Sequence, residues 1–133
     1  MAEEQAPVVV VLAWPTRGLS PNDRVHWRAL AAAKRRFRRL CWGEALEQRA
    51  AVRFWSQFDG TAPLQLRLTF CPPDRRRYDR DNLVARMKAG IDGLCDALQI
   101  DDSRFAEVVA AMGEPTKGGC VRLAIRAVAV AAE

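Results

Sequence analysis

Acidic residues occur as two close pairs in the second half of this chain. Asp79 and Asp81 are separated by one residue, and Asp101 and Asp102 are adjacent. Carboxylate oxygens are the hard ligands that Mg²⁺ and Mn²⁺ take in proteins, with water completing the coordination. Carboxylates that converge from two loops at one edge of a sheet can hold a metal that activates water and stabilises a phosphoryl-transfer transition state.

Arginines surround the first acidic pair, in the segment D-R-R-R-Y-D-R-D-N at residues 74–82. The planar fork of arginine makes bidentate contacts to phosphate, so we expect these cations to hold a phosphate backbone beside the acids. The candidate phosphate-binding residues are Arg75, Arg76, Arg77, Arg80 and, in a later turn, Lys117.

The same residues also have a purely structural interpretation. Acids at a helix start usually cap the helix, a D-D-S sequence is usually a turn, and surface ion pairs contribute little stability. Lys88 follows Asp81 by seven residues. Two helical turns place it on the same helix face as the acids, about 10 Å along the axis, where it is a phosphate contact, a catalytic cation or simply a solvated lysine.

Apolar periodicity predicts the elements that position these groups. Strands are expected over 8–13, 64–70, 105–112 and 121–130, and helices over about 22–50, starting after Ser20 as a cap, and about 80–98. Residues 114–119 are predicted to form a hairpin turn between the last two strands. The order β-α-β-α-β-β predicts an α/β (α+β) single domain over 1–133, with two helices packed on a four-stranded mixed sheet. Residues 1–7 and 131–133 are expected to be flexible tails.

Composition excludes several classes of protein. The 133 residues carry a net charge of +5, and all 21 cations except Lys34, Lys88 and Lys117 are arginines, which favours a polyanionic partner. No apolar run is long enough to span a membrane, and no export signal is apparent, so we expect a cytoplasmic protein. The four cysteines are widely spaced, which argues against structural zinc. No glycine pattern for a nucleotide cofactor is present.

Four motifs together resemble the RusA family of Holliday junction resolvases (crossover junction endodeoxyribonucleases) of phage or prophage type. They are D-R-R-R-Y-D-R-D-N-L at 74–83, K-A-G-I-D-G-L at 88–94, I-D-D-S-R-F at 100–105 and P-T-K-G-G at 115–119. The opening L-S-P-N-D-R-V-H-W-R at 19–28 is also similar to that of phage members. The resemblance extends over residues 8–127 and agrees with the predicted order of elements.

The resemblance implies roles for individual residues. Asp79, Asp81 and Asp102 match the family's metal-binding catalytic aspartates, with Asp101 as a neighbouring acid, and Lys88 matches its catalytic lysine. This chain has three extra residues within 84–87 relative to the bacterial prototype, and strict counting would place Ala85 at the lysine position. Tyr78 also stands where the prototype has a further arginine.

The resemblance thus implies a Mg²⁺-dependent endodeoxyribonuclease, with Mn²⁺ as a substitute, that resolves four-way junctions by paired symmetric nicks. The implied partners are branched DNA and a second copy of the chain, because a two-fold symmetric dimer presents two identical sites. The alternative is a non-catalytic binding module for branched or duplex DNA. A restriction-type nuclease is disfavoured, because no suitable acid-x-Lys sequence follows Asp74.

Overall fold

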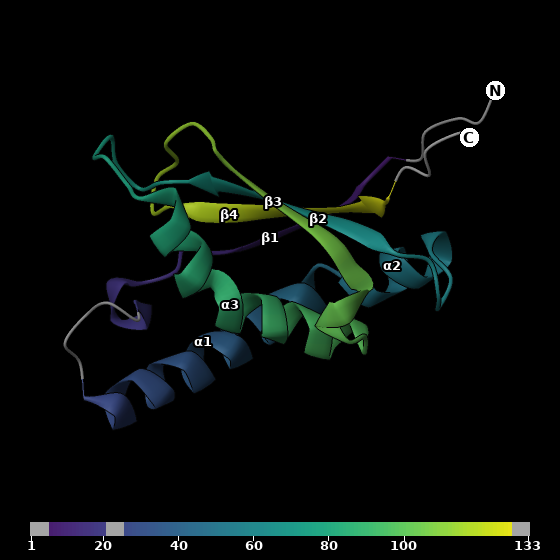
Figure 1. Ribbon diagram of the computed structural model, residues 1–133, viewed down its shortest axis with the longest axis horizontal. Helices are drawn as coiled ribbons and strands as arrows, with labels where there is room; N and C mark the ends of the chain where they lie inside the picture. Colours follow the sequence, from purple (N-terminus) through teal and green to yellow (C-terminus); the bar gives the residue numbers. More distant parts are fainter. Residues whose placement is uncertain (1–5, 21–25, 129–133) are drawn as a thin grey trace.

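The structure is a computed structural model that describes residues 6–20 and 26–128 (Figure 1). Its strands are β1 (Val8–Ala13), β2 (Leu64–Cys71), β3 (Phe105–Met112) and β4 (Cys120–Ala127). Its α-helices are α1 (Trp27–Glu47), α2 (Ala50–Gln57) and α3 (Arg80–Leu98), and two short 3-10 helices are η1 (Arg17–Leu19) and η2 (Asp102–Arg104). The predicted strands and the second predicted helix are all present.

The four strands form one mixed sheet in the order β1-β4-β2-β3. β4 pairs antiparallel with both β1 and β2, whereas β2 pairs parallel with β3. Helices α1 and α3 lie on one face of this sheet (Figure 1). The predicted α+β single domain with a four-stranded mixed sheet is therefore confirmed.

The predicted hairpin between the last two strands is wrong. β2 lies between β3 and β4, so the segment over 113–119 crosses the end of β2 instead of turning tightly. Two backbone bonds hold this crossing: Gly113 N donates to Phe70 O at 2.8 Å, and Thr116 N donates to Pro72 O at 2.8 Å. The segment is long enough to span two strand spacings of about 4.8 Å each, which a two-residue turn is not.

The long helix predicted over 22–50 is observed as α1, and a further helix that was not predicted, α2, follows it. Arg49 adopts a left-handed conformation with φ of 55°, which ends α1 and lets α2 start in a new direction. The N-cap of α1 is His26, whose Nδ1 accepts from Arg28 N at 3.2 Å. Ser20, the predicted cap, donates to Asn82 Oδ1 at 2.9 Å. The helix start that it was predicted to cap, residues 22–25, lies outside the described residues, as do most of the predicted tails.

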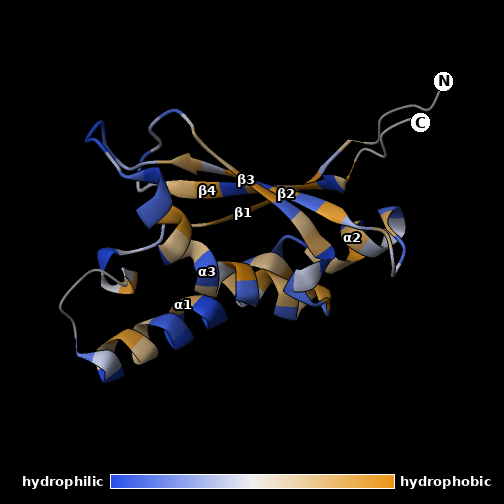
Figure 2. Cartoon of the chain, viewed as in Figure 1, coloured by the Kyte–Doolittle hydropathy of each residue, from blue (hydrophilic) through white to orange (hydrophobic). Residues whose placement is uncertain are grey.

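The core lies between the sheet and the helices. Leu64, Leu66, Leu68 and Phe70 of β2 are fully buried, as their alternation in the sequence predicts. The apolar turns of α3 face this layer (Figure 2). On the other face of the sheet, where no described helix packs, side chains such as Arg67 are exposed. No described helix is long and apolar enough to cross a membrane.

Helices α1 and α3 approach each other unusually closely. A Cβ atom on Gly93 would lie 2.2 Å from the backbone oxygen of Arg38, so only glycine allows this contact. A Cβ on Gly90 would meet the Phe37 ring at 2.8 Å. These two glycines therefore determine how closely α1 and α3 pack. Several of the predicted site residues lie on α3.

Candidate active site between α3 and β3

The first acidic pair is located at the start of α3. Asp79 is the N-cap, and its Oδ1 accepts from Asp81 N at 3.0 Å and from Asn82 N at 3.4 Å. The structural role suggested by the sequence is therefore present. This capping role uses one oxygen of Asp79. The carboxylates of Asp79 and Asp81 both remain exposed at the positive end of the helix dipole.

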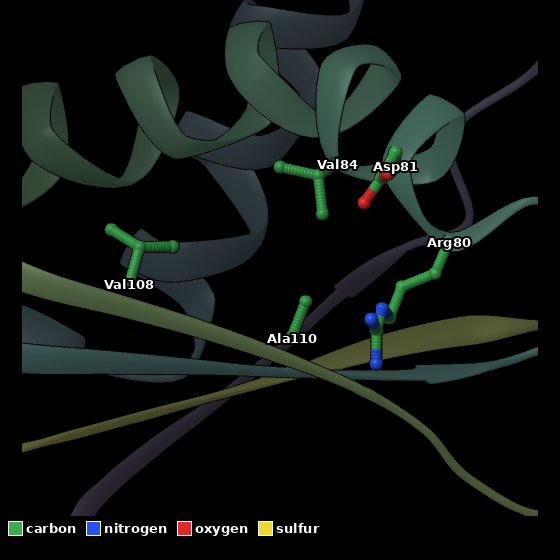
Figure 3. Close-up of a pocket in the computed structure, with 5 residues that line it drawn as sticks. All are labelled: Arg80, Asp81, Val84, Val108 and Ala110. Atoms are coloured by element: carbon green, nitrogen blue, oxygen red, sulfur yellow. The ribbon is translucent and has the colours of Figure 1, made fainter.

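Asp81 lies on the wall of an open hollow between α3 and β3. The hollow has a volume of about 470 Å³ and is lined by Arg80, Asp81, Val84, Val108 and Ala110. Figure 3 shows Asp81 beside the open space and Arg80 extending from the start of α3 toward the strands. This hollow at the edge of the sheet is thus lined by a carboxylate, a guanidinium and apolar side chains.

Lys88 lies two turns further along α3, between two carboxylates. Its Nζ donates to Asp102 Oδ2 at 2.7 Å and to Asp92 Oδ1 at 3.0 Å. These bonds, the one to Asp102 first, raise the pKa of Lys88 above its ordinary value. Lys88 is therefore a fully charged cation at neutral pH, and it neutralises part of the negative charge on the β3 side.

The second acidic pair forms the turn that enters β3. Asp101 caps η2, and its Oδ1 accepts from Ser103 N at 3.3 Å. Asp102 is exposed, and the hydrogen bond from Lys88 holds the pKa of its carboxyl below the ordinary value. Asp102 is thus ionised over the whole physiological range of pH and is available as an oxygen ligand or an ion-pair partner.

The structure brings Lys88 and Asp102 together but does not gather the carboxylates into one cluster. Within residues 6–20 and 26–128, no group of three or more His, Cys, Asp or Glu side chains is placed to hold a metal ion. Asp81 lies seven residues from Lys88 along the helix, which is about 10 Å. The donors are of the class that Mg²⁺ prefers, and they line one edge of the α3 and β3 layer without converging.

The arginine-rich segment forms an exposed loop between β2 and α3. Arg75, Arg76 and Arg77 are all exposed, and only Arg76 of the three forms an ion pair with a residue that the structure describes, at 3.6 Å from Asp74. The hydrogen bond from Thr116 N to Pro72 O ties this loop to the crossing segment that holds the exposed Lys117. The predicted phosphate contacts therefore come from two adjacent loops, at the end of the sheet where α3 starts.

Tyr78 and Trp14 pack against each other beneath this loop. Their rings meet edge to face, with centroids 5.3 Å apart, and the Tyr78 hydroxyl donates to Asp74 Oδ1 at 2.9 Å. Burial, and then the bond to Asp74, raise the pKa of Tyr78. In this arrangement both rings support the loop from below.

Sequence reasoning missed two partners of the predicted site residues. Asp92 is the second acceptor for Lys88, and the signal for it was the helical spacing of four residues between them. Asn82 binds Ser20 and so ties the start of α3 to the loop after β1. No local pattern indicates that second contact, because it joins residues 62 positions apart.

No family model matches this chain, but a search of known proteins finds a relative in sequence. The chain is 41% identical over 98 residues to a protein of Xylella fastidiosa (strain Temecula1) that is described as an uncharacterized protein. The match covers 72% of this chain and 61% of the relative, so the chain spans less than two thirds of that protein's length. The likeness supplies a relative in sequence but no activity.

Proposed function

We propose that this chain is a RusA-like endodeoxyribonuclease that nicks four-way DNA junctions in the presence of Mg²⁺, with Mn²⁺ as a substitute. The observation that supports it best is the 2.7 Å bond between Lys88 Nζ and Asp102 Oδ2. Its partners come from two separate motifs of the family resemblance, and Lys88 lies on the same helix as Asp81, two turns further along.

The pairing also supports Lys88, and not Ala85, as the matching lysine. Ala85 is on α3 three residues earlier and has no charge to offer, whereas Lys88 contacts one of the proposed metal-binding acids. Three extra residues add nearly one turn of helix, so the lysine keeps a similar face. Its ammonium is suited to stabilising the negative charge that develops on a phosphate in the transition state.

The proposed metal ligands are Asp79, Asp81 and Asp102, with Asp101 beside them. A divalent ion held there would supply charge neutralisation and an activated water. Each of these carboxylates is exposed, so its rotamer can change without disturbing the core. Arg80 at the mouth of the hollow, together with the Arg75–Arg77 loop and Lys117, would bind the phosphates on either side of the cleaved bond.

The second candidate is a DNA-binding module without catalysis. The observation that favours it is that the described residues contain no ready group of three metal ligands. In that case the Lys88 bonds to Asp92 and Asp102 are purely structural. The exposed arginines and Lys117 then account for all of the function, and binding is salt-dependent but independent of Mg²⁺.

The deciding experiment is cleavage of a labelled four-way junction built from synthetic oligonucleotides, with Mg²⁺ and with EDTA. We expect paired nicks that require the metal and that disappear in Asp81→Asn. Glu47→Gln is the matched control, because it removes one exposed carboxylate at the far end of α1. Binding without nicks in any metal favours the binding module, and equal nicking by Asp81→Asn rejects the metal site.

The proposal includes a homodimer that acts on cytoplasmic DNA of a bacterial cell or a phage-infected host. A four-way junction has two-fold symmetry, so two identical sites can make the paired nicks. Sedimentation equilibrium of the free protein tests this part separately. A monomer at the concentrations that support cleavage contradicts it.

A further inference from the structure

A basic groove, here called the α1/α3 groove, runs between the two long helices on the side away from the sheet. It has a volume of about 230 Å³ and is lined by Lys34, Arg35, Arg38, Ala85, Arg86, Lys88, Ala89 and Asp92. Five of these side chains are cationic and one is a carboxylate. The part of α1 that lies next to α3 is correspondingly hydrophilic (Figure 2).

We propose that the α1/α3 groove binds the phosphate backbone of a DNA strand that passes Lys88. This surface is distinct from the loops that hold Arg75–Arg77 and Lys117. The inference rests on the proposed function, because it assumes that the chain binds DNA. It adds a second contact surface, on the helices, that the motifs did not indicate.

Unpaired cations are the first support for this inference. Lys34, Arg35 and Arg86 form no ion pair with any residue that the structure describes, although all three line one groove. Nε of Arg86 is buried and lacks a hydrogen-bond acceptor among those residues. A buried donor without an acceptor is costly, so a shift of the Arg86 side chain toward a phosphate oxygen in the groove would relieve that cost.

The paired cations of the groove have a different role. Arg38 is held by Asp96 in a two-pronged ion pair, with nitrogen to oxygen distances of 2.7 and 2.8 Å. Lys88 is held by Asp92 and Asp102. These bonds hold two of the lining cations in place, whereas Lys34, Arg35 and Arg86 have no carboxylate partner among the described residues and remain available to an anion.

The helix crossing extends the basic surface into a second hollow. Gly93 brings α3 against the backbone of Arg38, and beyond this contact lies a hollow of about 340 Å³. It shares Arg35 and Arg38 with the groove and adds Arg39, Trp42 and Asp96. The indole of Trp42 is 40% exposed, so it offers a face for a base or sugar.

The position of Lys88 indicates where the bound DNA strand would run. Lys88 lines the groove and contacts Asp102 of the proposed active site at the same time. A DNA backbone that passes Lys88 can therefore contact both the groove and Asp102's side of the proposed active site. Ala85 and Ala89 lie one helical turn apart in its lining, and their short side chains leave room for phosphates.

The test compares DNA binding by Arg35→Gln/Arg86→Gln and the unmodified protein, in EDTA so that no cleavage occurs. Fluorescence anisotropy with a labelled four-way junction is repeated over a range of salt concentrations. If both side chains contact phosphates, the slope of log affinity against log salt falls by about two. Affinity at about 0.1 M salt falls on the order of tens-fold.

Arg67→Gln/Arg126→Gln is the matched control. It removes the same charge from exposed positions on β2 and β4, on the sheet face away from the helices. Lys34→Gln/Arg35→Gln, which leaves α3 intact, replaces the first variant if that variant does not fold. An equal loss of affinity in the control shows a general charge effect and overturns the groove.

Two further outcomes separate the possible failures. Unchanged binding by both groove variants overturns the groove but leaves the proposed function standing, whereas no binding by the unmodified protein rejects the proposed function itself.

Inorganic phosphate is then compared with chloride at equal ionic strength. If millimolar phosphate displaces the DNA and chloride does not, the groove is a pocket for a single anion, and the proposal that it binds a DNA backbone is overturned. If the two salts displace the DNA equally, the proposal is supported.

Discussion

Lys88 on α3 and Asp102 at the entry to β3 form a 2.7 Å ion pair across 14 residues of sequence. The bond links the helix that holds the first acidic pair to the turn that holds the second. Lys88 also lines the α1/α3 groove. The pair therefore connects the proposed chemistry with the proposed binding surface.

Removing the ammonium of Lys88 should change the titration of Asp102. Lys88→Met leaves a side chain of similar length without charge, so we expect the pKa of Asp102 to rise toward its ordinary value of 3.8. Carbon-detected NMR of the side-chain carboxyl measures this shift. Lys34→Met is the control, and an equal shift in that variant would show that general charge, not the bond, depresses the pKa of Asp102.

The ion pair between Arg38 and Asp96 should contribute a small, pH-dependent stability. Arg38 holds the pKa of Asp96 below 3.8, so the contribution is present above that pH and is lost as the pH falls through the lower pKa of the folded state. The side chain of Arg38 is 51% exposed and that of Asp96 is 42% exposed. We therefore expect Asp96→Asn to lower the free energy of unfolding by less than about 1 kcal/mol at neutral pH.

Urea unfolding at several values of pH checks this expectation. The difference between the unmodified protein and Asp96→Asn should be constant near neutrality and should shrink in acid. The double variant Arg38→Gln/Asp96→Asn completes a mutant cycle that isolates the pair. A difference that grows as the pH falls contradicts the sign derived from the pKa of Asp96.

The close contact at Gly93 should make this position intolerant of any side chain. Gly93→Ala places a Cβ atom 2.2 Å from the backbone oxygen of Arg38, so the helices must separate, at a cost of about 1–3 kcal/mol or more. Gly43→Ala is the matched control in α1, because nothing lies within 4 Å of its Cβ position. There the substitution should stabilise by up to about 1 kcal/mol. Chemical denaturation of both variants gives the comparison, and equal effects would contradict the close packing.

The four thiols should differ strongly in reactivity. Burial raises the pKa of Cys41 and of Cys95 to about 12, so both are protonated and shielded near pH 8. Cys120 is partly exposed and is the cross-strand partner of the buried Cys71. We expect iodoacetamide to modify Cys120 first in the native protein, and all four thiols after denaturation.

Mass spectrometry of alkylated peptides reads the order of modification. Rapid native labelling of Cys41 or Cys95 would contradict their burial beneath α1 and α3. A second, informative comparison is Cys120→Ser, in which native labelling should become slow at every remaining thiol.

Local patterns in the sequence were sufficient for the four strands and for α3, and for the place of Asp79 at the start of that helix. The alternation of Leu64, Leu66, Leu68 and Phe70 produces a strand with one buried face, and Asp79 caps the helix that follows. Both features depend on residues within a few positions of each other. The strand boundaries of β3 were predicted at Phe105 and Met112 for the same reason.

Tertiary structure alone decided how those elements meet. The insertion of β2 between β3 and β4 depends on pairing with a strand about 40 residues earlier, for example Leu66 with Val108, and no local period encodes it. The contact of Gly93 with Arg38 and the bond from Lys88 to Asp102 likewise join distant segments. Sequence by itself therefore determined which residues are candidates for a functional site. Packing determined which of them share an edge, because only the assembled sheet and helix pair fix the distances between side chains.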